Sequence, residues 1–577
     1  MQLFKSLNCF SKSVAVTILL VSNVILGSCG KSQDNRNMVA QETSQLIFST
    51  YLGGSTPFVP GGSALTFAQN TASDNQGNTY VTGATQVSDL PVLNAWQPAP
   101  LAGSTLSAFV AKYDPAGNLL WCTYLGGNQQ SLGVGVAVMP DGGVAVAGLT
   151  SSDASGAFPT MNAFQTQNNG ESDYFVAVFD ASGNLLYSTY LGGSGVEGTP
   201  RKVFTDDNNN GNNIAADAQG LVYITGTTSS GGDGSGTGKF HVTPNAIRPD
   251  LSGGTDAFLS IIDPGKSGAE SLVYSSFLGG ELDDKGHGVA ASGSGSYITV
   301  AGYTKSLNFP TTANAYRNHH APSGYTSNGF VSQFTSSLPG DPSSQYSARY
   351  STYLGADASD ARDDTYAVAL DSNGFIVATG RTQSADFPMV KPPVPTIYNS
   401  ASYLKPGTSN DESFLVKIDP SLTGEESLVY STFLGGGSPN PGGGGAFCTS
   451  VAVDTQGGAY VGGETSSQGI KYTPSSVPTP TEAPSQFPYT GDALYPALQG
   501  SFDAILMQIS PDGATLAYST FFGGTGNDRT YGLAVDPSGN IILTGLTFSS
   551  DFPLKNPAQP WPGNTGNQNA FVTKLRR

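Results

Sequence analysis

Charged residues are scarce in this chain of 577 residues, where Asp, Glu, Lys and Arg make up 12%, about half the usual share. Basic residues are the scarcer kind, with 25 Lys and Arg against 43 Asp and Glu and a net charge of −18. Nucleic-acid binding depends on cationic side chains, so we expect no DNA or RNA partner. Aromatic residues make up 10% of the chain, which argues against disorder, because disordered chains are usually rich in charge and poor in aromatics.

Residues with catalytic or metal-binding chemistry are also few. The four cysteines are far apart or close to the N-terminus, which predicts neither a disulfide framework nor a CxxC metal site: Cys9, Cys29, Cys122 and Cys448. The only histidines are His241, His287, His319 and His320, and no HExxH or GxSxG motif is present. The adjacent pair at 319–320 favours a surface loop over a metal site, because neighbouring side chains on an extended segment point apart. We therefore predict no catalytic residues.

The N-terminal segment has the pattern of a bacterial export signal. Lys5 and Lys12 precede an apolar stretch at 14–26 that is too short and too polar to span a bilayer. It ends in Leu-Gly-Ser-Cys at 26–29, which resembles the lipobox of bacterial lipoproteins. We predict a signal peptide at 1–28, lipidation of Cys29, and a polar tether within residues 29–45. This places the protein in the bacterial cell envelope, on a membrane through its N-terminal lipid, with the outer membrane favoured.

The rest of the chain is built from one repeated unit. An element of the form YSTYLGG occurs seven times, with 66 to 88 residues between starts: at 48–54, 121–127, 187–193, 274–280, 350–356, 430–436 and 518–524. A second element follows each copy, such as AVDPSGNIILTGLT at 534–547, and always ends in Gly-x-Thr. A third is a short apolar run such as AFVAKYD at 108–114.

These elements predict four antiparallel strands per unit. The second supplies strands a and b around an Asp-x-x-Gly turn, and the third and first supply strands c and d. Seven such units predict an all-β, seven-bladed β-propeller over residues 46–577. The chain begins with a d strand at 46–52 and ends with a c strand at 570–575. We expect these two strands to pair and close the ring.

The repeat resembles a known family at this point. The combination of YSTYLGG, AVDxxGNxYVTGxT, DFP and DAFVxK is similar to the SBBP, or seven-bladed beta-propeller repeat, family, with DFP standing at 386–388 and 551–553. The resemblance covers residues 46–577. It implies the propeller fold and a secreted or outer-membrane lipoprotein. It implies no particular activity and supplies no catalytic residues.

Length variation between the units predicts where binding takes place. Strand order puts the a–b and c–d turns at one end of the blades and the b–c and d–a connections at the other. Almost all variation in length falls on the b–c and d–a connections. Loops held on a rigid scaffold commonly bind partners, so we expect a binding scaffold for a protein or glycan. The alternative is that these loops merely cover the propeller.

One segment has the spacing of a calcium-binding loop. Asp206, Asn208, Asn210 and Gly211 match D-x-N-x-N-G, and Asp217 stands at position twelve. This set is a candidate calcium site, and calcium is the one cofactor that the sequence suggests. Asp217 is also the turn Asp of its repeat, and amide ligands weaken calcium binding, so an exposed Asn-rich loop is the alternative.

A second functional hypothesis is an enzyme, a lyase or hydrolase acting on polysaccharide at the central channel. Asp284, Asp363 and Asp528 precede three of the a strands. We expect each to organise its d–a loop, and an acidic ring around the channel mouth is the alternative. A converging cluster of Asp, His, Arg or Tyr at the mouth would favour an enzyme, whereas a lining of small residues would favour the scaffold.

Overall fold

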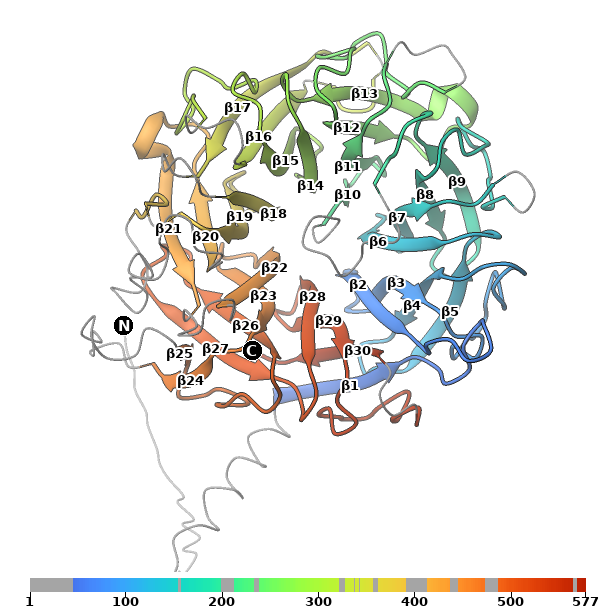
Figure 1. The fold of residues 1–577 in the computed structure, drawn as a ribbon. Coiled ribbons are helices and arrows are strands. Elements are labelled where there is room, and N and C mark those ends of the chain that lie inside the picture. The colour runs from blue at the N-terminus through green and yellow to red at the C-terminus, as the bar shows by residue number, and fades with distance from the viewer. Residues whose placement is uncertain are drawn as a thin grey trace, which may run out of the picture.

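Seven four-stranded antiparallel sheets stand around one axis as the blades of a propeller (Figure 1). The computed structural model describes residues 45–153, 157–198, 212–232, 238–320, 327–336, 338–341, 343–355, 362–384, 386–390, 412–435, 445–472, 486–563 and 568–577. In each blade the strand nearest the axis is a, followed outward by b, c and d (Figure 1). The predicted fold class is confirmed.

The blades are numbered in chain order. Blade 1 holds β2 (Thr66–Ser73), β3 (Thr79–Thr85), β4 (Ser107–Tyr113) and β5 (Leu119–Leu125). Blade 2 holds β6 (Ser131–Val138), β7 (Val144–Thr150), β8 (Asp173–Phe179) and β9 (Leu185–Leu191). Blade 3 holds β10 (Ile214–Ala216), β11 (Val222–Thr228), β12 (Asp256–Ile262) and β13 (Leu272–Leu278). Blade 4 holds β14 (Asp284–Ala291), β15 (Tyr297–Thr304), β16 (Asn328–Ser336) and β17 (Tyr346–Leu354).

Blade 5 holds β18 (Asp363–Leu370), β19 (Ile376–Thr382), β20 (Glu412–Ile418) and β21 (Leu428–Leu434). Blade 6 holds β22 (Ala446–Val453), β23 (Ala459–Thr465), β26 (Asp503–Ile509) and β27 (Leu516–Phe522). Its b–c connection adds a parallel pair, β24 (Gln468–Lys471) and β25 (Gln486–Tyr489). Blade 7 holds β28 (Asp528–Val535), β29 (Ile541–Thr547), β30 (Asn569–Leu575) and β1 (Leu46–Leu52).

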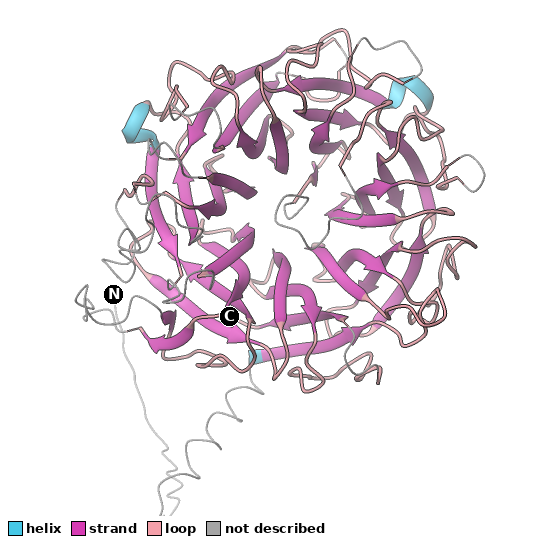
Figure 2. Ribbon diagram, viewed as in Figure 1, coloured by secondary structure: helices cyan, strands magenta, loops and turns pink. Residues whose placement is uncertain are grey.

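Helix is nearly absent from the described residues (Figure 2). Two short 3₁₀ helices, η2 (Gly268–Ser271) and η4 (Gly424–Ser427), lie in the c–d connections of blades 3 and 5. Within the ranges that the structure describes, no helix has the length and apolar character needed to cross a bilayer.

The apolar cores lie between neighbouring blades, and one smaller cluster around Phe67 joins blades 7, 1 and 2. Seven clusters of buried side chains each join one blade to the next, and blades 7 and 1 share one of them around Phe48 and Phe109. Strands b and c are therefore covered on both faces, so their sequences are continuous apolar runs. The blades are held together by packing between sheets.

The ring is closed by β1 and β30. Their register runs from Leu46 opposite Leu575 to Leu52 opposite Ala570, and the hydroxyls of Ser49 and Thr573 are 2.8 Å apart. The last blade thus takes three strands from the C-terminal part of the chain and its outer strand from residues 46–52. The pairing expected from the repeat phase is present.

In six blades the Gly of Gly-x-Thr lies opposite a bulge in strand a. In blade 1 the register shifts between Ala68 and Asn70, and the same shift recurs in each of the six full-length a strands. A side chain at Gly83 would collide with the backbone carbonyl of Phe67, and one at Gly302 or Gly545 would meet the equivalent carbonyl of its own blade. The bulge turns the inner strand, and only glycine leaves room for it.

Candidate functional site

The two ends of the ring differ as strand order predicts. We call the end with the a–b and c–d turns the turn end, and the end with the b–c and d–a connections the loop end. At the turn end, Asp74 accepts backbone hydrogen bonds from Gln76 and Asn78 at 2.9 Å, and Gly77 has φ of 80°. Asp217, Asp371, Asp454 and Asp536 form the same turn in other blades.

The b–c connections at the loop end are anchored to the outer strand of their own blade. In blade 1 the chain returns along β5, where the backbone N–H of Cys122 donates to Leu93 O at 2.8 Å and the Leu93 N–H donates back. A backbone hydrogen bond of this kind recurs in every blade, reaching Ser49, Ser188, Ser275, Ser351, Ser431 and Ser519. This strap covers the outer edge of strand d, which would otherwise present unpaired backbone groups.

The side chains of the YSTYLGG element hold the strap in place. In blade 4, Ser351 Oγ donates to the carbonyl of Pro310, and Thr352 Oγ1 accepts the Arg317 N–H at 2.9 Å. The Tyr353 hydroxyl donates to Ser306 O at 2.7 Å and accepts the Phe309 N–H. The repeated Ser, Thr, Tyr and DFP residues thus form one hydrogen-bonded unit. The sequence alone does not predict this unit, because its two parts are separated by a connection of variable length.

The first Gly of LGG lies beneath the junction between two blades. A Cβ on Gly279 would stand 2.7 Å from the carboxyl carbon of Asp256 and 2.7 Å from Asp284 Oδ2. Asp256 begins strand c of blade 3 and Asp284 begins strand a of blade 4. Gly523 has the same relation to Asp503 and Asp528. Polar side chains from neighbouring blades therefore meet at the loop end, over a position that must be glycine.

The three Asp residues that were expected to precede a strands are the first residues of those strands, and they are buried at these junctions. Asp284 Oδ2 accepts the Gly280 N–H at 2.6 Å, Asp528 Oδ2 accepts the Gly524 N–H at 2.8 Å, and Asp363 binds the hydroxyls of Thr382 and Ser384. Asp284 and Asp528 thus organise the d–a loops, as expected. All three side chains are at most 1% exposed, so they do not form an acidic ring open to solvent.

Around the axis, the six bulged residues of the inner strands all have side chains that are uncharged at pH 7. They are Gln69, Val134, His287, Tyr366, Thr449 and Tyr531. The His287 ring bonds to Thr365 O of the next blade at 3.0 Å, and Thr449 Oγ1 donates to Thr530 O in the same way. Beside the short β10, Asn212 bonds to the backbone of Val289 in blade 4 and of Val368 in blade 5.

A charged and aromatic cluster lies where blades 4 and 5 meet near the axis. Asp364 binds Arg362 at 2.7 Å and Arg381 at 3.2 Å. The amine of Lys285 lies 5.5 Å from the ring centre of Tyr303, and the guanidinium carbon of Arg362 lies 6.0 Å from it. The ring of His287 lies edge-on to that of Tyr303 at 5.5 Å and is tilted against that of Tyr366 at 5.6 Å. Burial lowers the pKa of His287 to about 4, so its imidazole is neutral at pH 7.

The sequence holds a weak signal for this cluster. The second residue of strand a is Phe67, Leu132 or Phe447 in three blades, but Lys285, Asp364 and Arg529 in three others. Charged residues at a repeat position that is otherwise apolar indicate a local specialisation.

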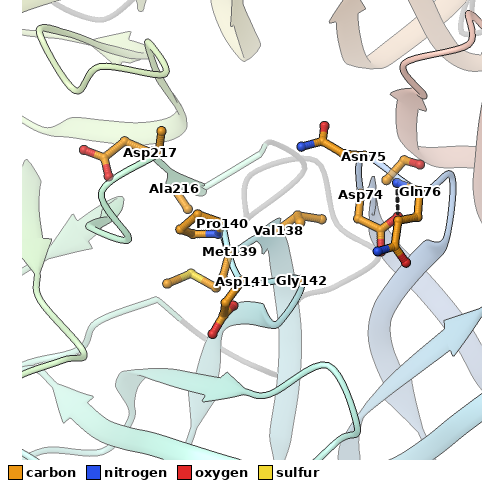
Figure 3. A pocket seen from close by; sticks show the side chains of 12 residues that line it. Asp74, Asn75, Gln76, Val138, Met139, Pro140, Asp141, Gly142, Ala216 and Asp217 are labelled. Carbon is orange, nitrogen blue, oxygen red and sulfur yellow. Dashed lines mark hydrogen bonds between the residues drawn. The ribbon is translucent and has the colours of Figure 1, made fainter.

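A hollow of about 510 Å³ lies at the turn end of blades 1 to 3 (Figure 3). Its lining comes from the a–b turns, residues 73–76, 138–142 and 216–218, and includes no basic side chain. Asp217 and Asn75 stand on opposite sides of it, with Met139 and Pro140 between them (Figure 3). Blade 2 has Met139 where its neighbours have the turn Asp, which leaves Asp141 exposed.

Several residues singled out in the sequence lie outside the described ranges. Cys29, Asp206, Asn208 and Asn210 are among them, so the lipid and calcium predictions remain predictions. Asp217 is described: its Oδ1 accepts two backbone N–H groups and its Oδ2 accepts the Tyr223 hydroxyl at 2.7 Å. The described histidines, cysteines and acids contain no group of three that could hold a metal ion.

The remaining cysteines and the paired histidines have structural surroundings. Cys122 and Cys448 are free, buried thiols, and burial raises the pKa of each to about 12. His319 is exposed, whereas His320 is buried with its ring 5.6 Å from that of Tyr353. The two neighbouring side chains therefore face different environments, as expected for an extended segment.

Comparison with known proteins gives a family match and several remote similarities. Residues 349–388 match the SBBP beta-propeller repeat model. Over 195 residues, 34% of this chain, the sequence is 25% identical to the regulatory protein FlaEY of Caulobacter vibrioides, of which this covers 18%. Over 164 residues it is 24% identical to the WD repeat-containing protein L264 of Acanthamoeba polyphaga mimivirus, covering 10% of that protein. The chain spans less than a fifth of either relative.

Among solved structures, hydrazine synthase of Kuenenia stuttgartiensis aligns with 89% of this chain and 96% of its own, at 10% identity and a TM-score of 0.36. The Dos1 propeller aligns with 90% of this chain and 95% of its own, at 9% identity and a TM-score of 0.35. Both similarities are low in sequence and in shape.

Proposed function

Because this chain carries the SBBP beta-propeller repeat, we propose that it is a membrane-anchored binding scaffold whose loop end receives a protein or glycan partner. The observation that supports this proposal is the asymmetry of the ring. At the turn end every a–b turn has five residues and the c–d connections are short, whereas almost all variation in length falls on the connections at the loop end. The straps hold part of each b–c connection against strand d, so the remaining segments start from fixed positions.

Partner binding can be tested with matched substitutions at the two ends. Leu307 in a b–c connection is 57% exposed, and Leu338 in a c–d connection of the same blade is 58% exposed. Leu282 at the loop end and Leu422 at the turn end are each 41% exposed. A partner can be identified by glycan array or envelope pull-down. We expect the double variant Leu282→Arg, Leu307→Arg to bind this partner at least about tenfold more weakly than wild type. The same changes at Leu338 and Leu422 should leave its affinity unaltered. The opposite result would place binding at the turn end and refute the proposal.

Membrane anchoring through Cys29 is the second part of the proposal. Several acyl chains on one terminus bind a bilayer firmly, whereas the propeller itself needs no contact with lipid. We expect Cys29→Ala to abolish incorporation of labelled fatty acid and to move the chain from the membrane fraction to the soluble one. Cys9→Ala, in the signal segment, is the control and should change neither. Retention of Cys29→Ala on membranes would exclude the lipid as the anchor.

The charged cluster between blades 4 and 5 supports a second candidate function, an enzyme acting on an acidic polysaccharide. The Nδ1–H of His287 donates to Thr365 O, which leaves Nε2 as the basic nitrogen of a neutral imidazole. Lys285 and Arg362 supply positive charge beside it that could neutralise a substrate carboxylate. These are the parts of a general-base site, although Asp364 already binds Arg362 and Arg381.

Turnover assays distinguish the two functions. If the cluster is catalytic, His287→Gln should abolish cleavage of uronate-containing polysaccharides and leave binding measured at equilibrium largely intact. His241→Gln is the matched control, since His241 packs edge-on against Phe164 away from the cluster. Absence of cleavage by the wild-type chain across uronate polymers would refute the enzymatic candidate and leave the scaffold.

A further inference from the structure

Three of the seven blade junctions bring together two carboxyl groups. The pairs are Asp173 with Glu197, Asp256 with Asp284, and Asp503 with Asp528, and all six side chains are 0% exposed. The first member of each pair begins strand c of one blade. The second precedes or begins strand a of the next blade, so each pair spans an interface between sheets.

The pair between blades 2 and 3 shows the geometry most clearly. Glu197 Oε1 accepts the hydroxyls of Thr228 and Ser230 in blade 3. Asp173 Oδ2 accepts the Asn169 N–H at 3.0 Å and the Gln165 amide at 2.7 Å. Asp173 Oδ1 and Glu197 Oε2 have no donor, and the two carboxyl groups are within hydrogen-bonding contact of each other. Only a proton between the two groups makes this contact attractive.

The carboxyl groups of the other two pairs converge beneath the LGG glycines. Asp284 Oδ2 and the carboxyl carbon of Asp256 lie equally close to the Cβ position of Gly279, and Asp528 and Asp503 converge on Gly523. Each of these carboxyls also accepts hydrogen bonds from backbone N–H groups of its own connection. Asp284 Oδ2 and Asp528 Oδ2 also accept the hydroxyls of Ser306 and Ser549.

The surrounding groups include little compensating charge. Tyr174 and Tyr190 face the first pair; Arg248, Asp283 and Tyr353 face the second; Asp551 and Tyr51 face the third. Arg248 is the only cation among these described neighbours. Two neighbouring buried carboxylates repel each other, because the protein interior does not solvate them.

We propose that these three blade junctions are proton-binding sites, each holding one proton shared between its two carboxyl groups across the interface. This inference does not depend on the proposed function. The other four junctions have a neutral residue in place of at least one acid, as in Asn328 with Asp363, where the Asn328 amide contacts the carboxylate at 3.5 Å. The amide N–H of Asn328 faces the carboxylate of Asp363 at any pH, whereas in the acid pairs the shared proton has this role.

The shared proton gives stability a defined pH dependence. Burial raises the pKa of Asp173 and of Glu197, raises that of Asp284 to about 7, and raises that of Asp503 to about 6. A carboxyl whose pKa is higher in the folded state binds its proton more tightly there. Its contribution is complete below about pH 4 and is lost as pH rises toward 7 to 8. The junctions should therefore be tightest in mild acid.

Proton release on unfolding tests the proposal in the full chain. We expect the triple variant Asp173→Asn, Asp284→Asn, Asp528→Asn to release about two to three fewer protons than wild type when unfolded at pH 6, because the third pair is then only about half protonated. Its melting temperature should also fall less between pH 5 and pH 9. Asp363→Asn, at a junction with a single acid, is the matched control and should keep the wild-type pH dependence.

A second measurement does not require the variant to fold. The infrared spectrum of wild type should show a protonated-carboxyl band at pH 7 that disappears above pH 9. Absence of that band, or equal proton release from wild type and triple variant, would overturn the proposal. A melting temperature raised by Ca²⁺ and lowered by a chelator, in wild type but not in the triple variant, would also overturn it by replacing the proton with a metal ion.

Discussion

Individual glycines in this repeat are required by what lies beside them. The Asp-x-x-Gly turns could be predicted from sequence, because Asp accepts its own turn N–H groups and Gly supplies the positive φ. The LGG glycine is different, since Gly279 faces the carboxyl groups of Asp256 and Asp284 from two blades. Its requirement depends on a contact between distant parts of the chain, which no local pattern reveals.

Substitution of the LGG glycine tests this close approach. We expect Gly279→Ala to destabilise the fold by about 1–3 kcal/mol, because the new Cβ would stand 2.7 Å from the carboxyl groups of a well-packed junction. Gly293→Ala is the control: no atom lies within 4 Å of its Cβ position. Chemical denaturation of both variants measures the difference. Equal stability of the two would show that the junction can open at no cost.

At the scale of the element, the b–c connection has two roles that the sequence does not separate. Strands a to d were predictable, because Asp-x-x-Gly turns and apolar runs mark them locally. The strap was not, since residues such as Leu93 and Cys122 pair across a connection of variable length. Much of each connection serves as scaffold, and only the segments between its anchored parts are available for partners.

The Tyr hydroxyl of the strap has a measurable contribution. Tyr124 OH donates to Val87 O at 2.8 Å and accepts the Leu90 N–H at 3.1 Å, all within the buried loop end of blade 1. We expect Tyr124→Phe to cost about 1–3 kcal/mol, because it leaves buried backbone groups without partners.

Tyr430→Phe is the matched control, since the Tyr430 hydroxyl is buried without a hydrogen bond. Its removal should be neutral or slightly stabilising. Urea denaturation of the two variants measures both effects. A Tyr124→Phe variant as stable as wild type would show that the strap is held by its backbone contacts alone.

At the scale of the whole molecule, closure of the ring was predicted by which strands begin and end the repeat region. The sequence of the repeat itself did not predict it. Seven copies, a leading d strand and a trailing c strand predicted the closed ring that β1 and β30 form. The candidate sites were not predictable in the same way. The cluster around Tyr303 and the acid pairs arise where neighbouring blades differ from the repeat, and their partners lie up to about 80 residues apart. Such sites depend on which blades become neighbours.

Closure gives the last prediction, because one seam holds together blades formed from both ends of the chain. Besides the β1–β30 ladder, Lys574 binds Asp536 at 2.8 Å within blade 7 and donates to Gly77 O at 2.7 Å in blade 1. Deletion of residues 569–577 removes strand c of blade 7, so β1 loses its partner and β29 gains an unpaired edge. We expect the truncated chain to melt at a lower temperature in a single transition and to self-associate. Arg576 and Arg577 lie beyond the end of β30, so their removal alone should leave the ring intact. If the longer deletion leaves a monomer with an unchanged melting temperature, the apolar cores between the blades, not the seam, hold the ring closed.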